Sequence, residues 1–138
     1  MLIVPTAWKV EDSIVRRTLL AWNFSRESTR ALHDSMPMLA KAGSVALFVF
    51  AADFDPRSTA VLDVVAHLER HDVKVTVDGW RDTKQSDAID AMFACLEREK
   101  SDLIVAGAYG HSPLRESLFG SVSEQLLDNI SMPVLMSH

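Results

Sequence analysis

Apolar segments of strand length alternate along this chain with amphipathic segments of helical length. The apolar segments include Thr18–Trp22, Ser44–Phe50 and Leu103–Ala106. Their near-continuous apolarity is typical of parallel strands that are covered on both faces. Between such strands, apolar residues recur at spacings of three and four, which indicates helices with one buried face. One such stripe is Ile89, Met92, Phe93 and Leu96.

Turn residues and caps set the expected boundaries. We expect helices over about 26–42, from Pro56 onward, over 86–99 and over 122–129, and further strands over 72–78 and 134–136. Pro37 should kink the first helix, and Gly43 should end it in left-handed geometry. Pro56 is expected at the start of the second helix. The alternating segment 72–78 should lie near an edge of the sheet.

This order of elements predicts one α/β domain over residues 1–138. Its sheet should have five mainly parallel strands with helices on both faces. The start of the chain, Met1 to Pro5, resembles the tail Pro133 to Met136. We therefore interpret residues 1–15 either as the remnant of a preceding repeat or as an extra edge strand, and the sequence leaves both interpretations open.

Composition and charge restrict the classes of partner. The formal net charge is −5, and an acidic domain repels the phosphate backbone of nucleic acid, so no nucleic-acid partner is expected. The chain shows no signal-peptide core and no apolar run of the ~18–20 residues that a membrane helix needs. We expect a cytoplasmic protein with no membrane partner. Cys95 is the single cysteine and is expected to be a buried structural thiol.

The residues most suggestive of chemistry lie between positions 105 and 123. Gly107 closes an expected strand, Gly110 follows, and Gly120-Ser121 precedes a helix expected from Val122. Glycine lets backbone amides approach a phosphate, and a helix N-terminus offers free N–H groups to an anion. This segment could therefore hold a triphosphate. The alternative is that the glycines only permit tight turns.

The spacing of these glycines resembles the ATP-binding signature of the universal stress protein family. The similarity extends over nearly the whole chain, including Leu19–Asn23, Gly110–Arg115 and Pro133–Met136. It implies a Rossmann-like parallel sheet with ATP over the carboxyl ends of the first and fourth strands, here at Ala21, Trp22, Asn23 and Gly107. It implies that main chain near Val49 meets adenine. The residues that would hold phosphate and ribose are Gly107, Gly110, Gly120, Ser121, Val122 and Ser123.

Two features qualify this resemblance. ATP-binding relatives usually place Asp and then Gly after the first strand, where this chain has Asn23 and Phe24. Asn can bond to ribose or adenine but supplies no carboxylate, and Phe adds bulk. His111 could face a phosphate and bind it more strongly when protonated, or it could be a loop histidine bonded to backbone or water.

We assign no catalytic residue and no protein metal site. Any Mg²⁺ should arrive with the nucleotide. The leading hypothesis is an ATP-binding stress or regulatory module. The alternatives are an interaction module of the same fold with a degenerate pocket, and at most a weak ATPase. The resemblance also implies a homodimer that pairs the last strands, here Val134–Ser137.

Overall fold

The computed structural model describes residues 1–6, 8, 15–51, 53–80, 85–107 and 131–137. Within these residues, a six-stranded sheet has the strand order β1-β6-β5-β2-β3-β4. Neighbouring strands are parallel except β1, which pairs antiparallel with β6. The strands are β1 (Leu2–Ile3), β2 (Arg17–Trp22), β3 (Ser44–Phe50), β4 (Lys74–Trp80), β5 (Leu103–Gly107) and β6 (Val134–Ser137), and the helices are α1 (Arg26–Leu39), α2 (Thr59–Glu69) and α3 (Gln85–Glu99).

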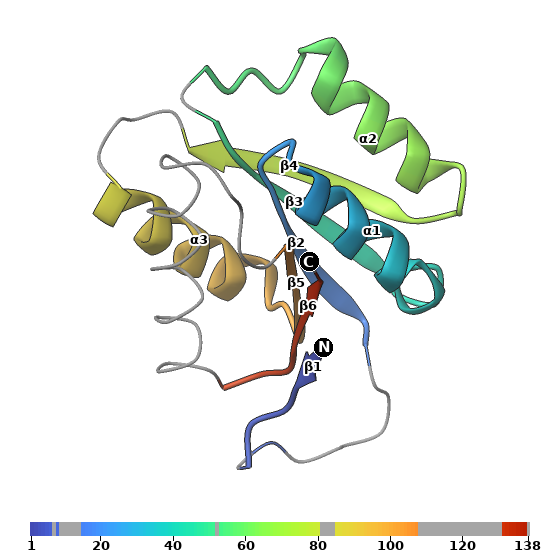
Figure 1. Ribbon diagram of the computed structural model, residues 1–138, viewed down its shortest axis with the longest axis vertical. Helices are drawn as coiled ribbons and strands as arrows, with labels where there is room; N and C mark the ends of the chain where they lie inside the picture. Colours follow the sequence, from blue (N-terminus) through green and yellow to red (C-terminus); the bar gives the residue numbers. More distant parts are fainter. Residues whose placement is uncertain (7, 9–14, 52, 81–84, 108–130, 138) are drawn as a thin grey trace.

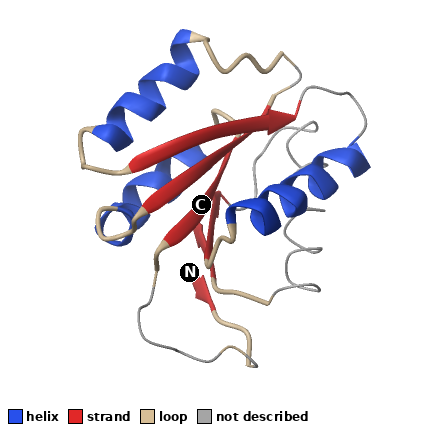
Figure 2. Ribbon diagram, turned by 180° about the vertical axis from the view of Figure 1, so that it is seen from behind, coloured by secondary structure: helices blue, strands red, loops and turns tan. Residues whose placement is uncertain are grey.

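Within the described residues, two helices cover one face of the sheet and one helix covers the other. Helices α1 and α2 lie on one face and α3 lies on the other (Figure 1). The view from behind shows the same layers, with the strands between the helices (Figure 2). Two separate hydrophobic clusters result, one on each face of the sheet.

Strand β2 supplies both clusters. Because successive side chains of a strand point to opposite faces, Leu19 and Ala21 join the cluster under α3, while Leu20 and Trp22 join the cluster under α1 and α2. All four side chains are at most 5% exposed. The continuous apolarity of this segment therefore reflects its position in the middle of the sheet.

The predicted fold class is confirmed, with one addition. Five strands are parallel as expected, and β1 adds a sixth, antiparallel strand at the edge next to β6. Its register places Leu2 opposite Leu135 and Ile3 opposite Val134. The origin of residues 1–15 in a preceding repeat stays a hypothesis. The helix expected over 122–129 lies outside the described residues.

The end of the first helix was predicted wrongly. Helix α1 ends at Leu39, and its C-cap is Ala40 in right-handed geometry. Pro37 lies in the last turn of α1, where the absent proline N–H already weakens the helical ladder. Gly43 does not adopt a positive φ; its N–H bonds to the carbonyl of Arg16 at 2.8 Å and leads directly into β3. The expected kink at Pro37 stays a prediction.

Two further boundaries were misplaced. Helix α2 begins at Thr59 after the cap Ser58, so Pro56 lies in the preceding turn. A serine cap accepts a hydrogen bond from an unpaired N–H of the first turn, and this fixes the start of α2. The alternating strand begins at Lys74 because Asp72 has a φ of 61°. This strand, β4, lies at the end of the described strand order, as predicted.

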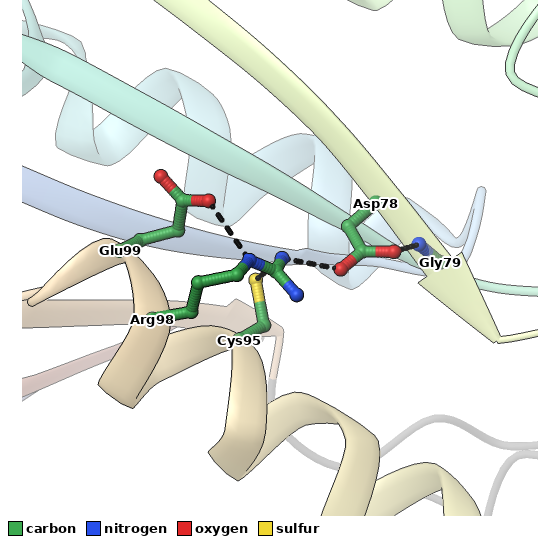
Figure 3. Close-up of polar contacts among 5 residues, drawn as sticks. All are labelled: Asp78, Gly79, Cys95, Arg98 and Glu99. Carbon is green, nitrogen blue, oxygen red and sulfur yellow. Dashed lines mark hydrogen bonds and ion pairs between the residues drawn. The ribbon is translucent and has the colours of Figure 1, made fainter.

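A polar contact joins α3 to β4 (Figure 3). The guanidinium of Arg98 donates to the carboxylate of Asp78 at 2.6 Å and to Sγ of Cys95 at 3.5 Å. Burial raises the pKa of the Cys95 thiol to about 11, and the charge of Asp78 adds to this effect. Cys95 is therefore buried, as the sequence predicts, and its raised pKa keeps the thiol protonated at neutral pH.

Three histidines gather where α1 and α2 lie side by side. The ring centroid of His67 in α2 is 5.7 Å from that of His33 in α1 and 5.1 Å from that of His71. Burial lowers the pKa of His67, and the charges of His71, His33 and Arg70 lower it further. These neighbours are all cations when charged, so they repel a protonated His67 in the folded state. Protonation of His67 therefore lowers the stability of the fold.

We predict that this cluster reduces stability in acid. The folded-state pKa of His67 lies below the unfolded value of about 6.5, so the unfolded chain binds more protons and the free energy of unfolding falls as pH drops below that value. In His67→Gln, the free energy of unfolding should change less between pH 7.5 and 5.5 than it does in the unaltered chain. Urea unfolding at each pH measures this change. An unchanged slope in this variant would contradict the assignment.

Candidate functional site

The strand order reverses at β2. From β2 the chain proceeds to β3 and β4 on one side, and it returns to place β5 and β6 on the other. In open α/β sheets the helices that follow such neighbouring strands diverge, and ligands bind in the crevice outside the carboxyl ends. The relevant ends here are Trp22 of β2, Phe50 of β3 and Gly107 of β5.

A tight turn carries the chain from β2 into α1. Oδ1 of Asn23 accepts a hydrogen bond from the N–H of Ser25 at 3.1 Å. Between them, Phe24 has a φ of 60°, in the left-handed region that bulky residues rarely adopt. Ser25 is the N-cap, and its hydroxyl accepts from the N–H of Ser28 at 3.1 Å. Asn23 therefore shapes the start of α1.

Further side-chain bonds reinforce this helix start. The hydroxyl of Ser28 donates to the carbonyl of Ser25 at 2.9 Å, and the hydroxyl of Thr29 donates to the same carbonyl at 3.0 Å. Ser25 and Ser28 are buried. Hydroxyls that bond locally favour caps and turns, so this polar run stabilises the start of α1.

Gly107 touches the first turn of α1. A Cβ atom at this position would stand 2.6 Å from the carbonyl carbon of Glu27 and 2.6 Å from the backbone N of Ser28. Atoms of two backbones cannot move apart as a flexible side chain can. Gly107 is therefore needed for close packing of α1 on β5, whatever else it contacts.

The structure brings part of the expected site together. Ala21, Trp22, Asn23, Val49 and Gly107 all lie near the carboxyl ends of β2, β3 and β5. The side chains of Ala21 and Val49 are 0% exposed, so only their main chain could meet a ligand. Nε1 of Trp22 is buried without a partner among the described residues. The other expected site residues, Gly110, His111, Gly120, Ser121, Val122 and Ser123, lie outside the described part of the chain.

A groove of about 730 Å³ runs along the exposed side of α1, and sequence reasoning missed it. The spacing of Arg26, Arg30 and His33 at i, i+4 and i+7 on one helix face could have revealed it. Glu27 and Asp34 offset some of this positive charge. The hydroxyl of Ser137 at the end of β6 donates to Oδ2 of Asp34. The lining residues are Phe24, Ser25, Arg26, Glu27, Thr29, Arg30, His33 and Asp34.

A smaller cavity of about 240 Å³ lies where β3 leads into α2. It shares Phe24 with the groove, and its lining is mostly apolar, with Phe54 and the carboxylates of Asp53 and Asp55 among its walls. Among the residues that the structure describes, no group of three or more His, Cys, Asp or Glu side chains could hold a metal ion. None of the described helices is long and apolar enough to cross a membrane.

The C-terminal part of the sequence is similar to a known family. Residues 83–138 match the profile of the universal stress protein family. The resemblance to universal stress proteins is confirmed. No curated protein shows significant similarity to the chain.

Solved structures share the fold, and some of them are universal stress proteins. One from Burkholderia pseudomallei has 20% sequence identity and a TM-score of 0.62, with 91% of this chain and 98% of that chain covered. The hypothetical protein MJ0577 has 21% identity and a TM-score of 0.69, with 91% and 96% covered. A universal stress protein in complex with cAMP has 18% identity and a TM-score of 0.66, with 91% and 98% covered.

The departure from the family pattern has a structural counterpart. At the position where ATP-binding universal stress proteins are expected to have glycine, Phe24 retains a positive φ. Asn23 still closes the turn through Oδ1, as an aspartate carboxylate could. Compared with the Asp-Gly expected from the resemblance, residue 23 lacks a negative charge and residue 24 adds a large side chain.

We predict that Gly107→Ala destabilises the protein by about 1–3 kcal/mol through overpacking against α1. Gly43→Ala is the matched control, because its Cβ would meet only the carbonyl oxygen of Arg16, at 3.3 Å. The control should change the unfolding free energy by less than about 1 kcal/mol. Urea denaturation measures both variants. Equal losses of unfolding free energy in the two variants would contradict a steric requirement for glycine at position 107.

Proposed function

We propose that this chain is a nucleotide-binding universal stress protein module with ATP as its ligand and a stress-response or regulatory role. One observation carries the proposal: the ends of β2 and β5 and the capped start of α1 converge where the strand order reverses. The glycine spacing that begins at Gly107 continues from this point along the sequence. A structurally similar universal stress protein in complex with cAMP supports a nucleotide as the ligand class.

The charges around the groove suit an anionic ligand of moderate charge. Arg26 and Arg30 line it beside the positive end of α1, and His33 adds a group that becomes charged in acid. Glu27 and Asp34 lie in the same lining and would repel a bare triphosphate. Mg²⁺ bound to the phosphates would reduce that repulsion, so the magnesium complex is the expected form of the ligand.

Calorimetry with nucleotide-free protein tests the proposal. We expect saturable ATP binding that is tighter with Mg²⁺ than without it, and a rise of the melting temperature with ATP concentration. Gly120→Val should abolish binding, because a side chain would occupy the space that a phosphate needs. Gly43→Ala should bind normally, because Gly43 lies at the amino end of β3, away from the carboxyl ends.

The contrary results point to the alternatives. A failure of ATP and ADP to raise the melting temperature at millimolar concentration would favour an interaction module with a degenerate pocket. Phosphate release that is lost in Gly120→Val would favour a weak ATPase. Gly107→Val is unsuitable for this purpose, since its side chain would collide with the backbone of α1 whether or not a nucleotide binds.

A homodimer through β6 is the second part of the proposal. In the described chain, β1 pairs with β6 on the side away from β5. The N–H of Met136 donates to the carbonyl of Met1 at 2.8 Å. Pairing of β6 with a second copy therefore requires β1 to leave. Because β1 has only two residues, the cost of its removal is small compared with a full strand pair.

We predict that Ile3→Pro promotes dimerisation. Proline removes the N–H of a residue paired with Val134 and should release β1, which leaves the edge of β6 open. Sedimentation velocity should show a larger dimer fraction than in the unaltered chain at equal concentration. A variant that stays monomeric while the unaltered chain dimerises would show that β1 itself forms the interface.

A further inference from the structure

The backbone of Phe24 is exceptional among the described residues. Three residues other than glycine have a positive φ: Phe24, Asp72 and Lys100. Asp72 and Lys100 follow the ends of α2 and α3, where left-handed residues commonly terminate helices. Phe24 instead precedes a helix, and its side chain is large. Backbone strain at a candidate site is a reason to ask what the side chain does.

The side chain of Phe24 is fixed on one side and open on the other. Its ring lies edge-to-face with the ring of Trp22, with centroids 6.2 Å apart and an interplanar angle of 81°. Trp22 is buried at 5% exposure, so it gives Phe24 a rigid support. Phe24 itself remains 41% exposed. A supported but exposed aromatic ring is suited to contact with a ligand.

Two cavities of different character meet at this ring. The smaller, about 240 Å³, is mostly apolar and has a second aromatic wall in Phe54. The ring of Phe54 is packed against Gly79, where an added Cβ would stand 2.6 Å from ring atoms, so this wall also has little freedom to move. The larger, about 730 Å³, carries Arg26 and His33, with Glu27 and Asp34 in the same lining.

The sizes of the cavities restrict the ligand. Ordinary small-molecule sites span about 300–1,000 Å³, so the small cavity holds a ring system rather than a whole ligand. Asp53 and Asp55 belong to its lining, and carboxylates can accept from the amino groups of such a ring; Oδ1 of Asp55 already accepts from the N–H of Arg57 at 2.9 Å. The groove offers cations to an anionic group. A planar heterocycle joined to a phosphate matches both cavities.

We infer that Phe24 is a specificity-determining residue that stacks on the base of the bound nucleotide. The base enters the cavity between Phe24 and Phe54, and the phosphates lie toward the groove along α1. This inference rests on the proposed nucleotide binding and adds the residue that selects for a base. Stacking on the aromatic ring thus contributes binding energy that offsets the cost of the strained backbone at Phe24.

Paired variants test the role of the ring. Phe24→Leu keeps an apolar side chain on the same backbone but removes the aromatic face, and Phe24→Tyr keeps that face. Calorimetry should show ATP binding about 5- to 100-fold weaker in Phe24→Leu and nearly unchanged in Phe24→Tyr. The magnesium complex of inorganic tripolyphosphate, which has no base, should bind the unaltered chain and Phe24→Leu equally. Equal melting temperatures in the absence of ligand show that the variants are folded alike.

Other outcomes overturn the inference in distinguishable ways. Unchanged ATP affinity in Phe24→Leu, or equal losses for ATP and tripolyphosphate, would show that the ring does not contact the base. Tighter ATP binding by Phe24→Gly than by the unaltered chain would mean that Phe24 obstructs the site, and the proposed nucleotide binding would stand. Absence of ATP binding in both the unaltered chain and Phe24→Gly would refute the proposed function itself, and the role of Phe24 with it.

Discussion

The backbone of α1 passes Gly107 at a distance that leaves no room for a side chain, and this contact determines the geometry around it. A Cβ at residue 107 would stand 2.6 Å from backbone atoms of Glu27 and Ser28. The first turn of α1 is therefore held against the end of β5, although its sequence follows β2. The groove along α1 is lined by residues of this same helix start, so the approach of α1 to β5 bears directly on where the groove lies.

The turn between β2 and α1 combines this packing with a change of chemistry. Asn23, Ser25 and Ser28 satisfy one another and the helix start through short local bonds. Local satisfaction allows the residue between them to vary in size, because its side chain is not needed to hold the turn. The residue at this position is Phe24, and its aromatic ring lies between two cavities. The turn can thus stay the same while its contact with a ligand changes.

The sequence predicts the buried strands best, because a strand covered on both faces must be apolar throughout, and Ser44–Phe50 agrees with the structure at both ends. The predicted ends of helices and strands were wrong where a local signal competed with tertiary structure. Gly43 was expected to cap α1, but its N–H is used by Arg16 of the neighbouring segment. The groove was missed because Arg26 and His33 look like any solvated helix face until the fold places them beside the carboxyl ends of the strands.

The position of β2 between β3 and β5 also bears on how the chain folds. The N–H of Arg17 bonds to the carboxylate of Asp102 at 3.1 Å, and the two residues are 85 positions apart. Closing so long a loop costs chain entropy before contacts offset it, whereas β2 and β3 are joined through α1 alone. The short connection through α1 therefore favours assembly of β2, α1 and β3 before β5 joins them. The candidate site would then be completed in the last stage of folding, when β5 brings Gly107 against α1.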